Sequence, residues 1–388
     1  MTATFDALGV SPDLVRALAR DGFTTPFPVQ SLTIPDALAG VDVCGKARTG
    51  SGKTLAFGLP MLQRVGRAQS RRPLGLVLVP TRELAKQVHE VLEPLAAELD
   101  VRLAAVYGGA PLAKQASALK SGVEIVVATP GRVIDLIEQK LLSVAAVEIV
   151  TVDEADRMND MGFRPQVEWI LRRIEGRHQT LLFSATLDGA VGSLIRRFMH
   201  DPVHYEVDEA PAIEAMTHRF LAVHQMDKPK LAAALIDAHE RALIFVRTKR
   251  GADRLVRQLV REGVHAEAIH GDRAQSHRER ALSRFAGGKL GALVATDVAA
   301  RGIDVEGVDV VIHFDPPEDP KAYTHRSGRT ARAGETGLVV TLSLWDQHLA
   351  VEALQRQLGL SEPIIEMFSN DPRLADLAGW NPADEEAA

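Results

Sequence analysis

The sequence predicts an α/β protein with two tandem domains, each a parallel sheet flanked by helices, joined by a flexible linker. Two observations lead to this fold class. Short apolar runs alternate with helical patterns along most of the chain, which is typical of a parallel sheet covered on both faces. The 388 residues, 46% of them hydrophobic, also suffice for two ordinary cores.

The alternation pauses at residues 201–217, where Pro202 and Pro211 accompany an acidic run with weak periodicity. Such a stretch is typical of an interdomain linker. We place the first domain at residues 1–207, the linker at 208–217 and the second domain at 218–360. The last segment, 361–388, has one basic and seven acidic residues. We expect it to form a short acidic tail whose last ten residues or so are disordered.

The strands themselves are predicted from the apolar runs. In the first half they lie at residues 41–44, 74–79, 101–106, 125–128, 149–152 and 180–183. In the second half they lie at residues 243–246, 265–269, 292–295, 308–313 and 338–342, in a series that begins near His218. Ligands of open α/β sheets bind at the carboxyl ends of the strands. The residues that directly follow these runs are therefore the candidate functional residues.

The net charge of −6 comes from two acidic stretches and does not by itself identify a partner. Residues 1–200 carry 23 Lys and Arg against 21 Asp and Glu, and residues 211–360 carry 21 against 19, so each part has a net charge of +2. The charge therefore neither supports nor excludes a polyanionic ligand, and the positions of arginines relative to loops decide the matter.

Several classes of protein are not favoured by the composition. Cys44, the single cysteine, lies in a predicted strand and is expected to be a core residue. The 13 histidines show no paired spacing with cysteine, so a zinc site is not expected. No apolar run approaches the roughly 18 residues of a membrane span, and no signal peptide precedes the first strand. We expect a soluble protein of the cytoplasm with no membrane association.

A phosphate-binding loop is predicted at residues 47–54, which read Ala-Arg-Thr-Gly-Ser-Gly-Lys-Thr. The loop follows a strand and precedes a helical pattern, as such a loop requires. Gly50 and Gly52 can adopt the positive φ values that turn backbone N–H groups toward phosphates. Lys53 would contact the β- and γ-phosphates, and the Thr54 hydroxyl a magnesium ion. Ala47 stands where the usual pattern has glycine. The alternative is a glycine-rich turn that enters a helix beside an incidental lysine.

Polar or glycine-rich clusters follow five predicted strands of the first half. Each cluster alone could be a helix cap, but five along one sheet edge favour a functional surface. The clusters are Pro-Thr-Arg-Glu-Leu at 80–84, Gly-Gly at 108–109, Thr-Pro-Gly-Arg at 129–132, Asp-Glu-Ala-Asp at 153–156 and Ser-Ala-Thr at 184–186.

In this order the clusters resemble the motifs of the DEAD-box RNA helicases, a family within helicase superfamily 2. Residues 153–156 spell the name of that family, and the matching pieces run from Phe5 to Arg332. The resemblance implies RecA-like domains, ATP and Mg2+ as cofactors, and RNA as the partner.

The resemblance also implies an adenine-recognising Q motif at residues 22–30, with Phe5 upstream. A glutamine amide offers one donor and one acceptor, which match the N6 and N7 edge of adenine. The alternative is that Gln30 only caps the following helix. Phe27 stands where the family usually has threonine. The residues expected to bind the nucleotide are Phe5, Phe23, Gln30, Ala47, Arg48, Thr49, Gly50, Ser51, Gly52, Lys53, Thr54, Asp153, Gly302 and Asp304.

The expected catalytic residues come from both domains. Asp153, with Thr54, would hold Mg2+, and Glu154 would orient and deprotonate the attacking water; two adjacent buried carboxylates are costly without a cation. Residues 295–304 and 325–332 resemble motifs V and VI, so Arg329 and Arg332 match the family's arginine fingers. The second domain has no phosphate loop of its own, and hydrolysis should therefore require domain closure. The catalytic set is Lys53, Glu154, Arg329 and Arg332, and the residues expected to couple the two domains are Asp156, Ser184, Thr186 and His325.

The remaining clusters resemble the RNA track of the family. Glycines, threonines and arginines at helix starts suit phosphates and 2'-hydroxyls, and with only 5% aromatic residues little base stacking is expected. Binding should therefore have little sequence preference, and the helix after Arg132 lies where the family bends the bound strand. The expected RNA-binding residues are Pro80, Thr81, Arg82, Gly108, Gly109, Thr129, Arg132, Thr248, Gln275, Arg278, Thr296 and Arg326.

These observations predict a monomeric ATP-dependent RNA helicase that separates short duplexes locally. Two alternatives stay open at this point. An ATP-gated RNA clamp would keep the fold and rarely turn over, although Glu154, Arg329 and Arg332 argue against it. A duplex DNA translocase is disfavoured by the adenine motif and the Asp-Glu-Ala-Asp tetrapeptide.

Overall fold

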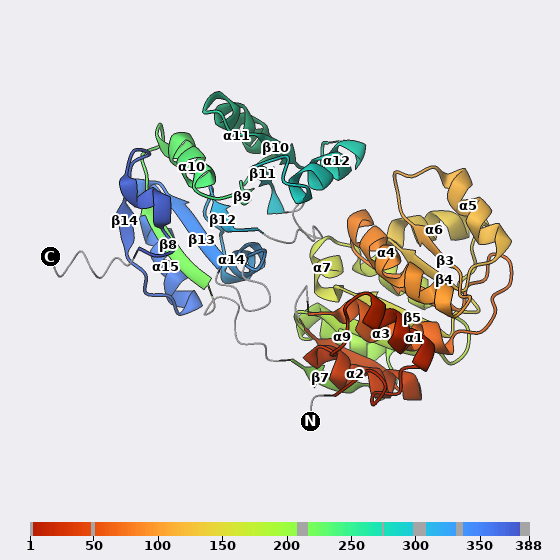
Figure 1. Cartoon of the computed structure of the whole chain (residues 1–388). Helices are drawn as coiled ribbons and strands as arrows, with labels where there is room; N and C mark the ends of the chain where they lie inside the picture. The colour runs from red at the N-terminus through yellow and green to blue at the C-terminus, as the bar shows by residue number, and fades with distance from the viewer. Residues whose placement is uncertain are drawn as a thin grey trace. The chain divides into compact units, whose positions relative to one another are not determined.

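The computed structural model of the chain describes residues 3–47, 51–207, 216–273, 275–297, 308–330 and 337–380. The chain divides into two compact units, residues 1–208 and 209–388. Figure 1 shows each unit as a sheet with helices on both faces.

The first unit contains a seven-stranded parallel sheet in the order β3-β4-β2-β5-β6-β1-β7. Its strands are β1 (Val43–Lys46), β2 (Gly75–Leu78), β3 (Leu103–Val106), β4 (Ile125–Ala128), β5 (Ile149–Asp153), β6 (Gln179–Ser184) and β7 (Val203–Glu206). Its helices are α1 (Pro12–Arg20), α2 (Pro28–Ala39), α3 (Lys53–Arg64), α4 (Arg82–Glu98), α5 (Leu112–Ser121), α6 (Pro130–Glu138), α7 (Ala155–Asp160), α8 (Arg164–Leu171) and α9 (Gly189–Phe198).

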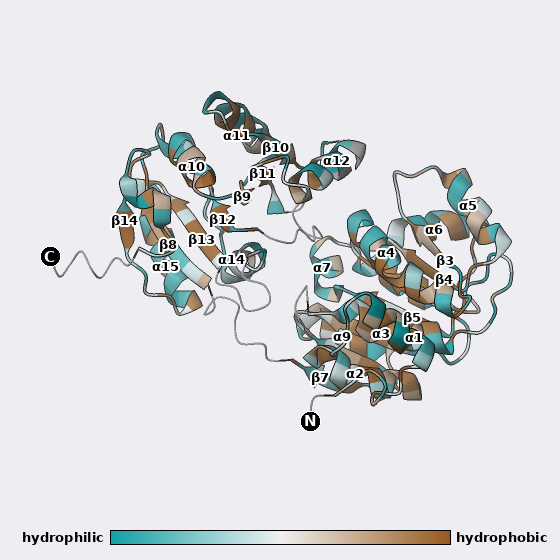
Figure 2. Cartoon of the chain, viewed as in Figure 1, coloured by the Kyte–Doolittle hydropathy of each residue, from teal (hydrophilic) through white to brown (hydrophobic). Residues whose placement is uncertain are grey.

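Successive strand residues enter two different cores, as expected for a sheet with both faces buried. Val77 and Val79 pack with α1, α2, α3 and α4, whereas Leu76 and Leu78 pack with helices α5 to α9. Figure 2 shows the strands mainly in the brown of hydrophobic residues. The helices have a brown, hydrophobic side and a teal, hydrophilic side.

The second unit repeats this plan. Its sheet is also parallel, in the order β10-β11-β9-β12-β13-β8-β14. Numbered from the start of each unit, the described strands follow the order 3-4-2-5-6-1-7 in both sheets. The strands are β8 (Met216–Ala222), β9 (Ala242–Phe245), β10 (Ala266–Ile269), β11 (Ala292–Ala295), β12 (Val310–His313), β13 (Gly337–Ser343) and β14 (Ile364–Glu366). The helices are α10 (Lys228–Asp237), α11 (Lys249–Arg261), α12 (Gln275–Ala286), α14 (Pro320–Ser327) and α15 (His348–Leu358), with short 3-10 helices at Trp345–Gln347 and Pro372–Asp376.

The predicted fold class is confirmed, with three corrections near the domain ends. Residues 203–206, which lie in the stretch where the alternation seemed to pause, form the edge strand β7 beside β1. The predicted linker ends too late, because β8 begins at Met216; its residues 208–215 lie outside the described part of the chain.

The predicted acidic tail also begins too early. Residues 364–366 pair with β8 as strand β14, and Met367, Leu374 and Leu377 are buried in the core of the second unit. The second unit therefore extends past the predicted boundary at residue 360. A three-residue edge strand has too few apolar positions to stand out in a sequence. Residues 381–388 lie outside the described part.

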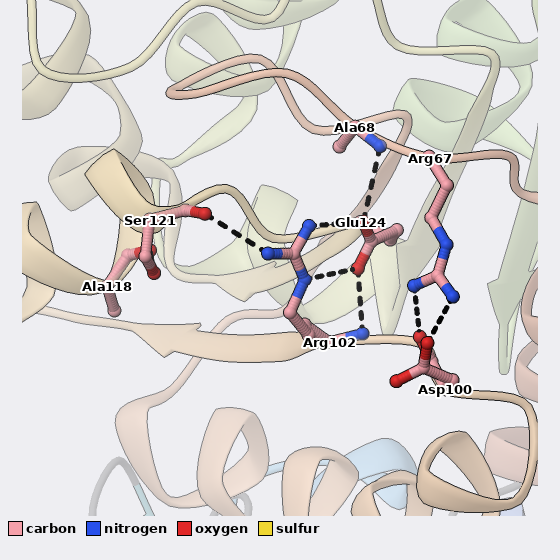
Figure 3. Close-up of polar contacts among 7 residues, drawn as sticks. All are labelled: Arg67, Ala68, Asp100, Arg102, Ala118, Ser121 and Glu124. Atoms are coloured by element: carbon pink, nitrogen blue, oxygen red, sulfur yellow. Dashed lines mark hydrogen bonds and ion pairs between the residues drawn. The ribbon is translucent and has the colours of Figure 1, made fainter.

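A buried carboxylate organises the amino-terminal edge of the first sheet (Figure 3). Glu124 precedes β4 and accepts hydrogen bonds from the backbone N–H and the guanidinium of Arg102, which precedes β3, at 2.7 to 3.0 Å. It also accepts one from the backbone N–H of Ala68 at 3.2 Å. Burial raises the pKa of Glu124, but these hydrogen bonds outweigh burial and lower the pKa to about 2. Arg67 and Asp100 form a second, exposed ion pair beside it.

Across the described part of the chain, none of the helices combines the length and the apolar character that crossing a bilayer requires.

Candidate functional site

The phosphate-binding loop lies between β1 and α3, as its sequence predicts. Gly52 has φ +84° and forms the N-cap of α3, and Lys53 is the first helical residue. The Lys53 ammonium donates to the carbonyl oxygen of Ala47 at 3.1 Å and lies 3.8 Å from Oδ1 of Asp153. Ala47, Ser51 and Lys53 are buried, and Thr54 is half-buried. The predicted ligands Arg48, Thr49 and Gly50 lie outside the described residues.

Two adjacent carboxylates stand at the end of β5. Asp153 is the last residue of the strand, and Glu154 has φ +53° before α7 begins. The Glu154 backbone N–H donates to Asp153 Oδ1 at 2.9 Å. Burial raises the pKa of Asp153 to about 6; Lys53 opposes this shift, and the charge of Glu154 adds to it. The positive charge near Asp153 is therefore too small to offset the effect of burial on its pKa.

This donor set fits a magnesium–nucleotide complex. Magnesium is usually bound by one or two carboxylates together with waters and substrate phosphates. Asp153 supplies a buried carboxylate 3.8 Å from the lysine that would contact those phosphates. In the described ranges, no group of three or more His, Cys, Asp or Glu side chains is arranged to hold a metal ion.

Gln30 connects the Q motif to the phosphate-binding loop. Its side-chain Nε2 donates to the carbonyl oxygen of Gly52 at 2.9 Å, and its Oε1 accepts from the backbone N–H of Phe27 at 2.8 Å. Gln30 therefore caps α2 and also contacts the phosphate-binding loop. Capping of the helix is thus compatible with the predicted role of Gln30 in recognising adenine. Phe23 is 42% exposed.

Phe5, which is predicted to contact the nucleotide, lies in the core of the first unit. Its side chain is only 3% exposed and packs in the core with α1 and α2. The ring therefore supports these helices.

The Ser184 turn connects the two functional strand ends. The carbonyl oxygen of Ser184 accepts from the backbone N–H of Ala47 at 3.0 Å, and its hydroxyl accepts from the N–H groups of Asp156 and Thr186 at 3.2 and 3.3 Å. Ser184 ends β6, which lies between β1 and β5 in the sheet. The predicted coupling residue Ser184 is therefore hydrogen-bonded to Ala47 of the phosphate-binding loop and to Asp156, which follows the acidic pair by two residues.

Three of the predicted RNA-binding clusters meet at one end of the first sheet. The Arg82 guanidinium lies against Gly108 and Gly109, so close that a Cβ added to Gly109 would be 2.2 Å from Nη1. Arg132 donates to the carbonyl oxygen of Ala110 at 3.3 Å. Thr81 caps α4, Thr129 precedes α6 and is half-buried, and Pro80 is buried.

The second unit places the other RNA-binding candidates at separate strand ends. Thr248 is exposed and caps α11, and its hydroxyl accepts from the Gly251 N–H at 3.0 Å. Thr296 is buried after β11, and Arg278 is half-buried on α12. Gln275 begins α12, and its side chain lies outside the described part.

Arg326, a predicted RNA-binding residue, is buried and paired within the second unit. It is only 4% exposed, and its guanidinium forms a bidentate pair with Asp297 at 2.6 and 2.7 Å and donates to the carbonyl oxygen of Asp315 at 2.8 Å. It also lies 5.3 Å from the Phe245 ring centroid. Arg326 is a structural link between the end of β11 and α14, and three of its guanidinium N–H groups donate to partners within the second unit.

The arginine-finger candidates are only partly described. His325 is exposed on α14, and Arg329 follows that helix with its side chain buried. Gly302, Asp304 and Arg332 lie outside the described residues.

Sequence reasoning missed two residues beside this site. Arg157 forms a buried ion pair with Glu154. Its position three residues after Glu154 on a predicted helix start was the available signal. Phe27 is 47% exposed and lies against Gly52, with ring atom Cδ2 2.8 Å from where a Cβ on Gly52 would stand.

Comparison with known proteins gives a consistent result. Residues 27–193 match the DEAD/DEAH box helicase family, and residues 227–334 match the helicase conserved C-terminal domain. The chain is 43% identical over 341 residues to the ATP-dependent RNA helicase CshA of Listeria monocytogenes, covering 87% of this chain and 65% of the relative. It is 42% identical over 344 residues to the DEAD-box ATP-dependent RNA helicase CshA of Bacillus subtilis, covering 88% of this chain and 69% of the relative.

Solved structures agree. The chain is similar to S. cerevisiae Dbp5 bound to RNA and ADP BeF3, with a TM-score of 0.82 and 29% identity over 95% of this chain and 96% of that one. It is also similar to Mss116p bound to ssRNA and AMP-PNP, with a TM-score of 0.83 and 27% identity over 99% of this chain and 84% of that one. The two sheets therefore correspond to tandem RecA-like domains, and the chain belongs to the DEAD-box family of ATP-dependent RNA helicases.

Proposed function

We propose that this protein hydrolyses ATP in an RNA-stimulated reaction and uses it to separate short RNA duplexes or to remodel RNA–protein complexes. The observation that carries the proposal is the meeting of Lys53, Asp153 and Glu154 at the ends of β1 and β5, joined through Ser184 of the strand between them. This is where a phosphate-binding lysine and a water-orienting carboxylate must meet.

In this proposal the first unit binds the nucleotide. Lys53 and the N–H groups at the start of α3 contact the phosphates, and Gln30 recognises adenine beside Gly52. Thr54 and Asp153 would hold Mg2+, which when bound neutralises charge on the phosphate oxygens. The raised pKa of Asp153 supports this assignment, because a buried carboxylate with too little positive charge nearby gains from a cation.

Glu154 orients the attacking water and accepts its proton, and Arg329 and Arg332 of the second unit meet the charge that develops on the transferred phosphoryl group. Such arginines contribute roughly 10³ to 10⁵ in rate. Because they belong to the other domain, the proposal requires closure of the two domains for hydrolysis. The domains are taken as residues 1–207 and 216–380.

RNA is proposed to bind through its sugar–phosphate backbone. The convergence of Arg82, Gly109 and Arg132 supports a surface that reads phosphates and carries little sequence information. Dbp5 and Mss116p, which resemble the chain over most of its length, were each solved with RNA.

A monomer in the cytoplasm is the simplest form of this proposal. One chain supplies both halves of the proposed nucleotide site, so no second copy is needed to complete it. ATP and RNA, the two ligands that the proposal requires, are both cytoplasmic.

ATP hydrolysis with and without single-stranded RNA tests the function. We expect RNA to raise the rate and to tighten ATP binding by the same factor as ATP tightens RNA binding, since the coupling is reciprocal. Lys53→Ala should abolish hydrolysis, whereas Glu154→Gln should leave ATP bound and RNA held. Equal affinities with and without the partner, release of RNA by the glutamine variant, or equal stimulation by DNA of the same sequence would each contradict the proposal.

A further inference from the structure

The proposed water-orienting carboxylate has an internal partner. Glu154 Oε2 forms an ion pair with the guanidinium Nη1 of Arg157, and the two side chains are 6% and 9% exposed. The burial of both groups distinguishes this pair from the surface pairs of the first unit, such as Arg67 with Asp100, whose side chains are 61% and 86% exposed. Exposed pairs contribute little, because water competes for both partners.

The backbone builds this pair into the end of β5. Glu154 adopts the left-handed conformation, φ +53° and ψ +49°, in which a residue other than glycine is strained. Helix α7 starts at the next residue, so Arg157 lies about one helical turn from Glu154 on the same side. The pair therefore follows from the local geometry of this strand-to-helix junction.

The pair conflicts with the role that we propose for Glu154. A carboxylate that orients water must offer an oxygen to it, and here Oε2 is taken by a guanidinium. Lys53 shows the same kind of internal satisfaction, because its ammonium lies near Asp153 and donates to Ala47. Lys53 and Glu154 are thus both paired within the protein.

Helix α7 also contacts the turn that is proposed to couple the domains. The Asp156 N–H donates to Ser184 Oγ, which also accepts from the Thr186 N–H. Arg157 is the next residue after Asp156. A displacement of the Ser184 turn would therefore reach Arg157 through one hydrogen bond.

From this geometry, and resting on the proposed function, we infer that Arg157 is a positioning residue that restrains ATP hydrolysis. While the pair is closed, Arg157 holds Oε2 of Glu154 and restricts the carboxylate from orienting water. When RNA binding moves the Ser184 turn, α7 shifts, the pair opens and Glu154 becomes available. Arg157 would thus make hydrolysis depend on RNA.

The test compares kcat and KM for ATP with and without saturating poly(U) RNA in wild type and Arg157→Gln. Suppose that the Glu154 carboxylate is separated from Arg157 about a tenth of the time in wild type. Loss of the pair should then raise the kcat measured without RNA by roughly five- to tenfold. The KM for ATP and the RNA-saturated kcat should stay within about twofold of wild type. The ratio of the RNA-saturated kcat to the RNA-free kcat should therefore fall.

Arg164→Gln is the matched control. Arg164 pairs with Glu168 at 2.9 Å on the neighbouring helix α8 and does not contact Glu154 in any described interaction. We expect this variant to behave as wild type. Arg157→Lys keeps a cation and should raise the RNA-free rate less than Arg157→Gln does. Arg157→Met, which keeps the length of the side chain, replaces the glutamine variant if its thermal unfolding midpoint lies below the assay temperature.

The outcomes separate the possibilities. An RNA-free rate that is unchanged or lower in both neutral variants would show that Arg157 only supports the site, and the inference would be wrong. An equal rise of kcat with and without RNA would overturn the inference that RNA binding opens the pair between Glu154 and Arg157. Hydrolysis by Glu154→Gln at the wild-type rate would instead remove the proposed role of Glu154, independently of Arg157.

Discussion

The side-chain amide of Gln30 donates to the carbonyl oxygen of Gly52 across 22 residues of sequence, at 2.9 Å. This bond fixes the Q motif against the phosphate-binding loop. Any ligand that displaces the loop therefore also acts on the start of α2, where Gln30 accepts from the Phe27 N–H. Four predictions follow from the contacts around this site and in the two sheets.

Replacement of Gly52 by alanine should weaken ATP binding more than tenfold. Its φ of +84° costs an L-residue roughly 1–2 kcal/mol, and a Cβ would stand 2.5 Å from Gln30 Nε2 and 2.8 Å from the Phe27 ring. Fluorescence titration with a labelled ATP analogue measures the change. Gly176→Ala is the control, because Gly176 also has a positive φ, +75°, but nothing lies within 4 Å of the added Cβ. Equal affinity of the Gly52 and Gly176 variants would show that the contact is unimportant.

Replacement of Gln30 by alanine separates its two roles. The change removes two part-buried hydrogen bonds, to the Phe27 N–H and to the Gly52 carbonyl, which should lower the free energy of unfolding by about 1–3 kcal/mol. If Gln30 also recognises adenine, the preference for ATP over GTP should fall in the same variant. Competition of both nucleotides against a labelled ATP analogue measures this preference. A stability loss with an unchanged preference would leave Gln30 as a helix cap only.

Glu124 should make the stability of the first unit depend on acid pH. Its folded pKa of about 2 is below the ordinary value of 4.5, so the unfolded chain binds the proton more readily. The stabilisation, about 3 kcal/mol, should be complete above pH 4.5 and should be lost as the pH falls toward 2. Glu124→Gln should be less stable than wild type at pH 7, and the difference should shrink at pH 3.

Urea unfolding followed by Trp169 fluorescence, in a Trp345→Phe/Trp380→Phe background, reports on the first unit alone. Asp100→Asn is the control, because its pair with Arg67 is exposed and should contribute little. A constant gap between wild type and Glu124→Gln from pH 7 to pH 3 would contradict the assigned pKa.

Arg326 should support the second unit and not RNA directly. Because Arg326 is buried and Asp297 is bound to it in a bidentate pair, Arg326→Gln should lower the free energy of unfolding of that unit by about 3–5 kcal/mol. Trp345 and Trp380 fluorescence in a Trp169→Phe background measures it. Asp297→Asn should produce a loss of similar size, and the double variant should lose less than the sum. A stable Arg326 variant with weak RNA binding would restore the original prediction.

Much of the fold was predictable because its signals are local. A buried parallel strand reads as a continuous apolar run, so nearly all central strands were predicted within a few residues, among them β4 and β11 at both ends. The edge strands β7 and β14 were missed, since each is only three or four residues long and neither contains a fully buried residue. The identical strand order of the two sheets could not be predicted, because strand pairing joins residues far apart in the chain.

The sequence by itself determined the phosphate-binding loop, the acidic pair and the family motifs, because each is a short run whose chemistry depends on neighbouring residues. Only the tertiary structure decided which of these side chains are available. Phe5 is taken by the core, Arg326 by Asp297 and Glu154 by Arg157. The physical reason is that burial and pairing depend on what other segments bring to the same place, and residue type alone does not reveal this.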